Sequence, residues 1–422
     1  MNIHKTVVIL LALLLAGMAM VPIVSADDDS TESSASSLSQ GQTLQPASGS
    51  TVNIDEAESL ALYNVRELAT KDQELSLWSD ATVELATTYY DIKNQKTAYA
   101  FNVLKDGQYA GYILISATTD KYPVLELSKG RIPGSDPEIA VKSRAMISES
   151  LSEGKEKIVS DYTPVYLGGL DYYQKYTVKN LKTKKNEEVF VDVHSNKIVN
   201  ISDVKIFVPD KITPAQWNTY QKEKQDDIRK SWSLQRQMMQ NGSVANMAVS
   251  ARSTLSYTNT ISGVPIYLWT RGCSPTAAAM VLGYWHDHGY SSLPLSTTLI
   301  NAIADKMATD PSGSTWPFNI GYGVNQVLNT YQYYSLRASD DYVPTWSRDV
   351  AEIDASRPFV LSMYNGGTGA GRSTPYEDHS VTCIGYMDST PQLLKIYDTW
   401  EGSTYHWLQY NNWGWAMNTY VR

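Results

Sequence analysis

The sequence has little basic charge. Its 35 Lys and Arg residues stand against 44 Asp and Glu, which gives a formal net charge of −9 and a pI near 5.2. No long stripe of Lys and Arg supplies the positive surface that binds phosphates. We therefore expect no nucleic-acid partner, and the acidity mainly favours solubility.

Long apolar runs are absent after residue 24, so no later segment is expected to cross a bilayer. The uncharged run at residues 6–24 follows Lys5 and precedes Val24-Ser25-Ala26 and an acidic stretch, the layout of a secretory signal peptide cleaved after Ala26. Residues 1–26 are thus predicted to direct export, and the protein is expected to be secreted or at the cell surface. The alternative is an uncleaved signal anchor, the only membrane contact we expect.

Residues 27–50 are rich in Ser, Thr, Gln and Asp and poor in apolar residues, which predicts a flexible leader without a core. At 422 residues the chain can hold two further domains, each with its own core. Residues 51–206 are predicted to form a small α+β domain. Its expected helices are residues 54–69 and 138–156, and its expected strands are residues 97–103, 109–117, 122–127, 172–178 and 188–201.

This first region resembles the prosegment of streptopain-type cysteine peptidases. The resemblance rests on an aromatic strand at residues 99–103, a "GYILISA" strand at residues 111–117 and "YPVL" at residues 122–125. It implies an intramolecular partner that folds over a peptidase domain. His194, the one histidine in the region, is interpreted as an ordinary surface or edge residue. Residues 207–256 are predicted to be a helical linker, with a solvated helix at 213–240 and then a segment rich in Ser, Ala and Asn that proteases reach easily.

Only two cysteines are present, and Cys273 lies at a helix start. Pro275 suits a first helical turn, Ser274 is a candidate cap, and the Ala-rich run that follows predicts a buried helix. A helix N-terminus together with a nearby imidazolium lowers a thiol pKa from ~8.5 to roughly 3.5–7.5, which makes a nucleophile near neutral pH. A small apolar residue at a helix start is the alternative, so Cys273 needs a partner.

His379 is the expected partner. It opens a β-rich run, and the following strand ends at Asp398. Antiparallel pairing of the two strands through the turn at residues 388–391 would bring Asp398 beside His379. Cys273 would then attack a carbonyl as thiolate, His379 would shuttle the proton, and Asp398 would orient the imidazole ring.

Three motifs in this order resemble the papain superfamily, in particular the double-glycine leader peptidases and their free-standing secreted relatives. The motifs are the helix start at residues 272–285, the "DH" strand at residues 378–386 and "YDTW" at residues 397–400. The resemblance implies that residues 257–422 form a cysteine peptidase-like domain. Its fold would be α+β, with a helix packed on an antiparallel sheet.

The sequence departs from this family at one point. Such peptidases usually carry a glutamine about six residues before the cysteine as the second oxyanion donor, and residues 265–272 contain neither Gln nor Asn. Tyr267 occupies that position, and Trp269, Thr270 and Arg271 are further candidates. Loss of one such donor typically lowers the rate ~100- to 1000-fold.

Several alternatives compete with this triad. A disulfide between Cys273 and Cys383 is the simplest role for two cysteines in an exported protein, but Cys383 lies four strand residues, roughly 13 Å, beyond His379. His406 is a rival base whose flanking residues do not match the family. The pair His286 and His288 could suggest a metal, but residues two apart on a helix diverge, so no metal is expected.

The sequence therefore predicts an exported cysteine peptidase with a Cys273–His379–Asp398 triad, a polypeptide substrate, no cofactor and an inhibitory or chaperone-like prosegment. Two rivals stay open. One is an adhesion or peptide-binding module that keeps the fold without turnover, and the other is a thiol-dependent amide transferase. No ABC-transporter segments follow, so a dedicated leader-export role is not expected.

Overall fold

The structure is a computed structural model that describes residues 49–199, 201, 212–241, 257–364, 379–400, 402 and 404–422. The predicted signal peptide, the leader before residue 49 and most of the Ser- and Ala-rich linker lie outside these residues. All described residues belong to one compact unit, Thr43–Arg422.

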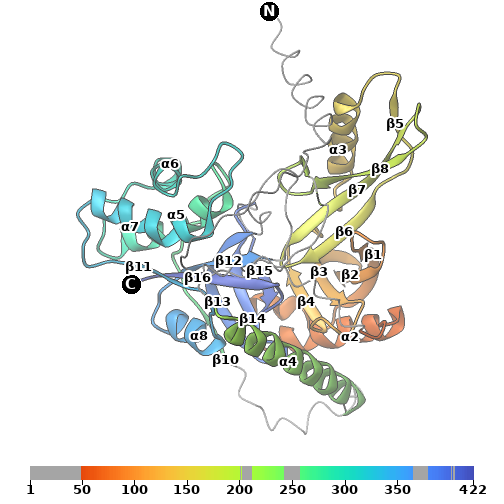
Figure 1. The fold of residues 1–422 in the computed structure, drawn as a ribbon. Coiled ribbons are helices and arrows are strands. Elements are labelled where there is room, and N and C mark those ends of the chain that lie inside the picture. Colours follow the sequence, from red (N-terminus) through yellow and green to blue (C-terminus); the bar gives the residue numbers. More distant parts are fainter. Residues whose placement is uncertain are drawn as a thin grey trace, which may run out of the picture. The chain divides into compact units, whose positions relative to one another are not determined.

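The N-terminal region combines helices with a series of β-hairpins (Figure 1). Its helices are α2 (Ile54–Ala69), the 3₁₀ helix η1 (Gln73–Trp78) and α3 (Pro137–Ser150). Its strands are β1 (Thr82–Tyr90), β2 (Lys96–Lys105), β3 (Gln108–Ser116), β4 (Val124–Ser128), β5 (Glu156–Ile158), β6 (Thr163–Gly168), β7 (Asp171–Asn180), β8 (Asn186–Asp192) and β9 (Lys197–Val199).

The C-terminal region has its helices mainly before its strands. The helices are α5 (Cys273–Asp287), α6 (Ser296–Lys306), the 3₁₀ helix η2 (Pro317–Asn319), α7 (Ile320–Thr330) and α8 (Trp346–Asp354). The strands are β10 (Tyr257–Thr260), β11 (Ala338–Asp341), β12 (Phe359–Tyr364), β13 (Ser380–Asp388), β14 (Leu393–Tyr397), β15 (His406–Gln409) and β16 (Trp415–Val421).

One sheet runs through both regions. Its order is β11-β16-β12-β13-β14-β15-β4-β3-β2-β1-β6-β7-β8-β9, with β10 beside β13 and β5 beside β7. All pairs are antiparallel except β1 with β6. The two regions meet where β15 pairs with β4, Trp407 lying opposite Leu127. The predicted α+β class with a helix on an antiparallel sheet is confirmed, while the boundaries of the predicted domains stay a prediction.

Helix α5 packs on the sheet at β12 and β13. It is buried on all sides from Cys273 to Tyr284, because its Ala-rich sequence lets α6, α7 and the sheet approach closely. Burying a Leu, Val or Met side chain contributes roughly 1.5–3 kcal/mol, so this helix is a fixed support for the residue at its N-terminus.

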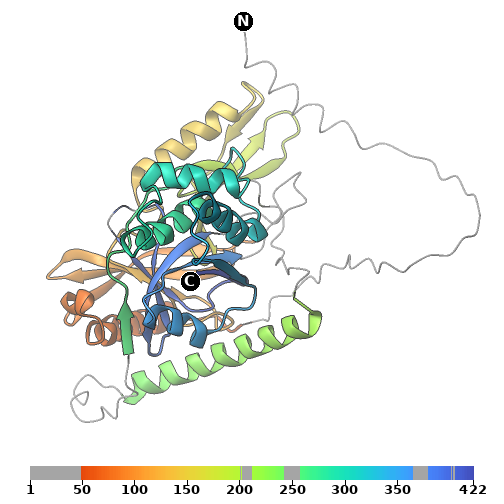
Figure 2. The ribbon, with the colours of Figure 1, turned by 90° about the vertical axis from the view of Figure 1, so that its left-hand side faces the viewer.

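A long helix, α4 (Pro214–Asn241), connects the regions and is seen along its length in Figure 2. Its mostly polar sequence contacts the rest of the chain through a few buried residues. Trp232 donates to the Lys121 carbonyl at 2.7 Å, and Lys224 donates to the Trp413 carbonyl. Within the described ranges, no helix is both long and apolar enough to span a membrane.

Most elements expected from the sequence are present with small shifts. Asn53 caps α2 by accepting from the Glu56 amide at 2.8 Å. The β2–β3 hairpin turns at Asp106 and Gly107, both with positive φ. The predicted helix at residues 138–156 is too long, because Leu151 is extended and Gly154, at φ +70°, turns the chain into β5.

Candidate active site

Cys273 is the first residue of α5 and is 8% exposed. The expected cap by Ser274 is wrong. The helix begins two residues earlier than that interpretation implies, Gly272 is the N-cap, and no side chain caps the helix. As the first residue of α5, Cys273 has its amide in the first helical turn, where the backbone N–H groups point toward the end of the helix.

Gly272 is required by the backbone at this point. Its φ is +149°, and a Cβ there would lie 2.4 Å from the Gly313 carbonyl oxygen. We expect Gly272→Ala to destabilise the fold by about 2–3 kcal/mol and to displace Cys273. Urea unfolding measures the first effect and thiol labelling the second. Gly263→Ala is the matched control, since Gly263 has φ +81° with open space around it and should lose only about 1–2 kcal/mol. Equal losses in the two variants would contradict the steric role of Gly272.

Two contacts join the start of α5 to the strand that follows His379. The hydroxyls of Ser274 and Ser380 lie 2.8 Å apart, and Ser380 also lies 2.9 Å from Ser362 on β12. One turn further, Thr382 donates to the Ala277 carbonyl at 3.0 Å. The residues that follow Cys273 and His379 are thus held together, which places the predicted nucleophile and base on neighbouring backbones.

His379 precedes β13 and is 4% exposed. Its Nε2 lies 2.6 Å from the backbone carbonyl oxygen of Asp398. A carbonyl can only accept, so Nε2 carries the proton and Nδ1 of the neutral ring is left as a base. The expected strand pairing creates this contact, since β13 and β14 are antiparallel with Thr382 opposite Tyr397.

The carboxylate of Asp398 has other partners. One oxygen accepts from the Trp400 amide at 2.9 Å, and the other lies 3.2 Å from Nε2 of His406. The sequence suggested His406 as a rival base. In the structure its imidazole contacts the Asp398 carboxylate and is 2% exposed. Asp398 therefore meets His379 through its backbone carbonyl and His406 through its side chain.

His406 extends this chain of contacts into the N-terminal region. Its Nδ1 lies 3.3 Å from the Tyr112 hydroxyl, which donates to Glu126 at 2.6 Å. Glu126 is fully buried, and burial raises the pKa of this carboxyl against the opposing effect of His406. The candidate acid is thus connected to side chains of β3 and β4.

The indole of Trp400 lies between two imidazoles. It stacks on His379 with ring centres 3.5 Å apart and on His194 at 3.7 Å, with interplanar angles of 10° and 2°. The interpretation of His194 as an ordinary surface residue is therefore wrong, because the turn between β8 and β9 inserts it against the candidate site. Burial lowers the pKa of His379 to about 3 and that of His194 to about 4.

The second cysteine lies elsewhere. Cys383 is fully buried on β13, its sulfur 3.6 Å from the Gly385 carbonyl oxygen, and neither cysteine forms a disulfide. Burial raises the pKa of the Cys383 thiol well above its usual value. Cys383 is therefore a poor nucleophile at neutral pH.

The structure narrows the candidates for the second oxyanion donor. The prediction of Tyr267 as the second oxyanion donor is wrong. Its hydroxyl lies beside Gly283, which is ten residues and about 15 Å along α5 from Cys273. Thr270 donates to the Leu268 carbonyl, and Arg271 pairs with Asp305 at 3.2 Å. Among the candidates for the second oxyanion donor, Trp269 is the one whose ring lies next to the contact between Gly272 and Gly313.

In the described part of the chain, no three His, Cys, Asp or Glu side chains are grouped so that they could hold a metal. His286 and His288 donate from Nδ1 to separate backbone carbonyls, those of Leu293 and Tyr284, and so diverge as expected.

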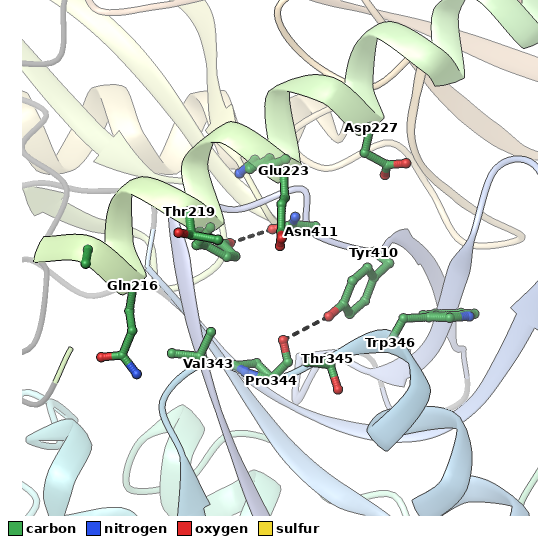
Figure 3. A pocket seen from close by; sticks show the side chains of 13 residues that line it. Gln216, Thr219, Glu223, Asp227, Val343, Pro344, Thr345, Trp346, Tyr410 and Asn411 are labelled. Carbon is green, nitrogen blue, oxygen red and sulfur yellow. Dashed lines mark hydrogen bonds between the residues drawn. The ribbon is translucent and has the colours of Figure 1, made fainter. Parts of the chain in front are cut away.

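A cavity of about 540 Å³ lies between α4 and the segments at residues 343–346 and 410–411 (Figure 3). Its aromatic and amide groups bond mainly to each other. Tyr220 lies 2.5 Å from the Asn411 side-chain oxygen, and Tyr410 donates to the Pro344 carbonyl at 3.1 Å. None of the three predicted triad residues lines this cavity.

Sequence reasoning missed His194, Trp400 as a stacking partner, and the pair Tyr112 and Glu126. No local signal identifies His194 or Tyr112, since the contact of His194 with Trp400 and that of Tyr112 with His406 join distant parts of the chain. The best available hint was Trp400, which ends the "YDTW" motif. The structure brings Cys273, His379 and Asp398 into one region, and their catalytic roles stay a prediction.

The C-terminal part of the chain is similar to a known family. Residues 255–421 match the family model described as the Peptidase_C39 like family. A C39-like protein from Bacillus anthracis, described as such from its crystal structure, is 16% identical, with a TM-score of 0.27 over 39% of this chain and 98% of its own. A fragment of prointerpain A from Prevotella intermedia, carrying a cysteine-to-alanine substitution, is 11% identical, with a TM-score of 0.36 over 81% of this chain and 98% of its own. No curated protein matches the sequence.

Proposed function

Because residues 255–421 match the model of the Peptidase_C39 like family, we propose that this protein is an exported cysteine peptidase of the papain superfamily, made as a latent precursor. The family suggests cysteine peptidase activity. The assignment to individual residues is carried by one observation: the start of α5, the start of β13 and the end of β14 meet through the contacts of Ser274 with Ser380 and of His379 with Asp398.

The proposed reaction is hydrolysis of a peptide bond. Nδ1 of His379 takes the thiol proton, and the Cys273 sulfur attacks the substrate carbonyl carbon. The amide of Cys273 donates to the oxyanion, and the imidazolium returns its proton to the leaving amine. Water then attacks the acyl-enzyme and releases the second product. Asp398 acts by fixing the ring and stabilising the imidazolium.

Latency follows from the environment of His379 in the full chain. The imidazole of His379 is buried against Trp400, on which His194 also stacks. The pKa of His379 is about 3, so the imidazolium needed in the reaction is strongly disfavoured. Release of the β8–β9 turn would return water to this ring and raise its pKa toward the ordinary value. The N-terminal region would thus inhibit the site electrostatically as well as by covering it.

The prosegment role also explains the shared sheet. The pairing of β15 with β4 and the contact of Tyr112 with His406 attach the N-terminal region directly behind Asp398. In this proposal, cleavage in the linker after α4 precedes separation of the two regions, since exposed polar linkers are where proteases act most easily. The protein would be secreted or held at the cell surface.

A thiol-directed epoxide tests the proposal. We expect the matured protein to be labelled at Cys273, with at least ~10-fold slower reaction at Cys383, because the latter is buried and its thiol pKa is raised. Mass spectrometry of the secreted protein reports both the labelled residue and the mature N-terminus. Labelling of neither cysteine, or of both equally, would contradict a catalytic Cys273.

Two other functions predict different outcomes. An adhesion or peptide-binding module on this fold would bind peptides without labelling or turnover. An amide transferase would be labelled at Cys273 but would form a new amide when an amine acceptor is added. Product analysis with and without the amine separates transfer from hydrolysis.

A further inference from the structure

The β8–β9 turn touches both walls of the candidate site. His194 reaches Trp400 on the side of His379, and three residues later Lys197 reaches the side of Cys273. The ammonium of Lys197 donates to the Ser312 carbonyl at 2.9 Å and lies 5.3 Å from the centre of the Trp269 ring. The start of β9, just after this turn, thus presents one basic side chain to the wall formed by Trp269 and Ser312.

This wall is continuous with Cys273. A Cβ on Gly313 would come within 2.6 Å of the Trp269 ring, and the Gly313 carbonyl fills the space beside Gly272. Trp269, Gly313 and Gly272 therefore contact one another in succession, ending at the residue before Cys273. A side chain held by Trp269 and the Ser312 carbonyl therefore lies on the wall that leads to the backbone of Cys273.

The groups on this wall favour a cation. The face of a tryptophan ring and the oxygen of a carbonyl both carry negative partial charge. Asp310 accepts from the amides of Ser312 and Ser314 at 2.8 and 3.0 Å, which fixes the loop with the Ser312 carbonyl at the ammonium. The nearby cation Arg271 is paired with Asp305 at 3.2 Å, which reduces its repulsion of an incoming positive charge.

We propose that Trp269 and the Ser312 carbonyl form a subsite for a lysine or arginine side chain of the polypeptide substrate, and that Lys197 occupies it in the precursor. This inference rests on the proposed function and specifies its substrate class. Both Trp269 and Lys197 are exposed, so the subsite is an open rim rather than a closed pocket. A carboxylate side chain is disfavoured there, because both the ring face and the carbonyl repel it.

A peptide series tests the substrate preference. The matured protein is given fluorogenic peptides in which lysine, norleucine or glutamate is moved through each position before the scissile bond. We expect kcat/KM about ten-fold higher for lysine than for norleucine at one position, since norleucine keeps the apolar stem but has no charge. Trp269→Leu should remove this preference, and Trp269→Tyr, which keeps a ring face, should retain most of it.

The outcomes separate the two proposals. Hydrolysis with equal rates for lysine and norleucine at every position overturns the subsite and leaves the peptidase intact. If no peptide is hydrolysed and Cys273 is not labelled, the peptidase itself is wrong and the subsite with it.

The uncut precursor tests the occupancy by Lys197. We expect Lys197→Met to increase the rate of epoxide labelling at Cys273 about five-fold, because the loss of one cation–π contact and one charged hydrogen bond weakens the hold of the turn. Lys197→Arg, which keeps the charge, should label like the unchanged chain. Equal rates for all three chains, with unchanged circular dichroism, would overturn this part of the inference.

Discussion

Replacement of Cys273 by alanine is expected to lower peptide hydrolysis by about 10⁴-fold or more and to stop any self-processing. The reason is chemical, since no other described thiol faces this site and His379 alone cannot form the acyl-enzyme. Because alanine is tolerated at the start of a helix, the fold should lose only about 1 kcal/mol. Hydrolysis of a fluorogenic peptide and the size of the chain recovered from the medium measure the two effects.

Cys383→Ala is the matched control. It also removes a buried sulfur, but from the interior of β13, the strand that begins after His379. We expect a loss of about 1–2 kcal/mol in unfolding free energy from the cavity, with kcat retained. Full hydrolysis by Cys273→Ala, or a loss of turnover in Cys383→Ala without unfolding, would end the proposed assignment.

The stability of the precursor is expected to fall on acidification between pH 6.5 and 4. The pKa of His194 is about 4 in the fold, against an ordinary value of 6.5, so in this window the unfolded chain binds a proton that the folded chain does not. Stability is therefore greatest above pH 6.5 and decreases as the pH falls toward 4. For His194 alone the loss is about 3 kcal/mol.

The variant His194→Phe isolates this effect. It keeps a ring to stack on Trp400 and cannot take up a proton. Urea unfolding of both chains at several pH values should show the variant losing about 3 kcal/mol less than the unchanged chain between pH 7 and pH 4. Parallel pH profiles for the two chains would show that His194 is not held neutral in this contact.

Comparison with a variant is needed because other buried groups respond to pH in both directions. His379 acts in the same sense as His194, with a pKa of about 3. Burial raises the pKa of Asp192 and of Glu126, so their protonation in the fold offsets part of the loss. The difference between the two chains removes these common contributions to the extent that His194 does not interact with them.

If the acid effect is confirmed, it gives the latent state a physical basis. Burial makes protonation of His194 unfavourable while its ring is stacked on Trp400, so the β8–β9 turn is held less tightly at low pH. Neutral pH would then maintain the precursor, and acid would assist separation of the two regions. The same contact explains why His379 can be correctly placed and still be chemically unsuited to form an ion pair with Cys273.

Local sequence signals were sufficient for most individual elements. The Asp106-Gly107 turn and the periodicity of residues 54–69 each depend on backbone preferences of a few adjacent residues, and the structure agrees with both. The pairing of β13 with β14 was accessible for the same reason, since a short turn joins them. The wrong cap at Ser274 shows the limit, because a buried hydroxyl partner on Ser380 outweighs the local preference.

The sequence by itself determined the α+β class, the helix that begins at Cys273 and the order of three motifs, because these depend on local backbone preference and on the family pattern of residues 255–421. Only the tertiary structure decided what surrounds them: the exclusion of Tyr267, the placement of His406 behind Asp398, and the two walls touched by His194 and Lys197. The contacts of His194 and Lys197 join residues far apart in the chain and accompany the pairing of β4 with β15, which no local pattern encodes.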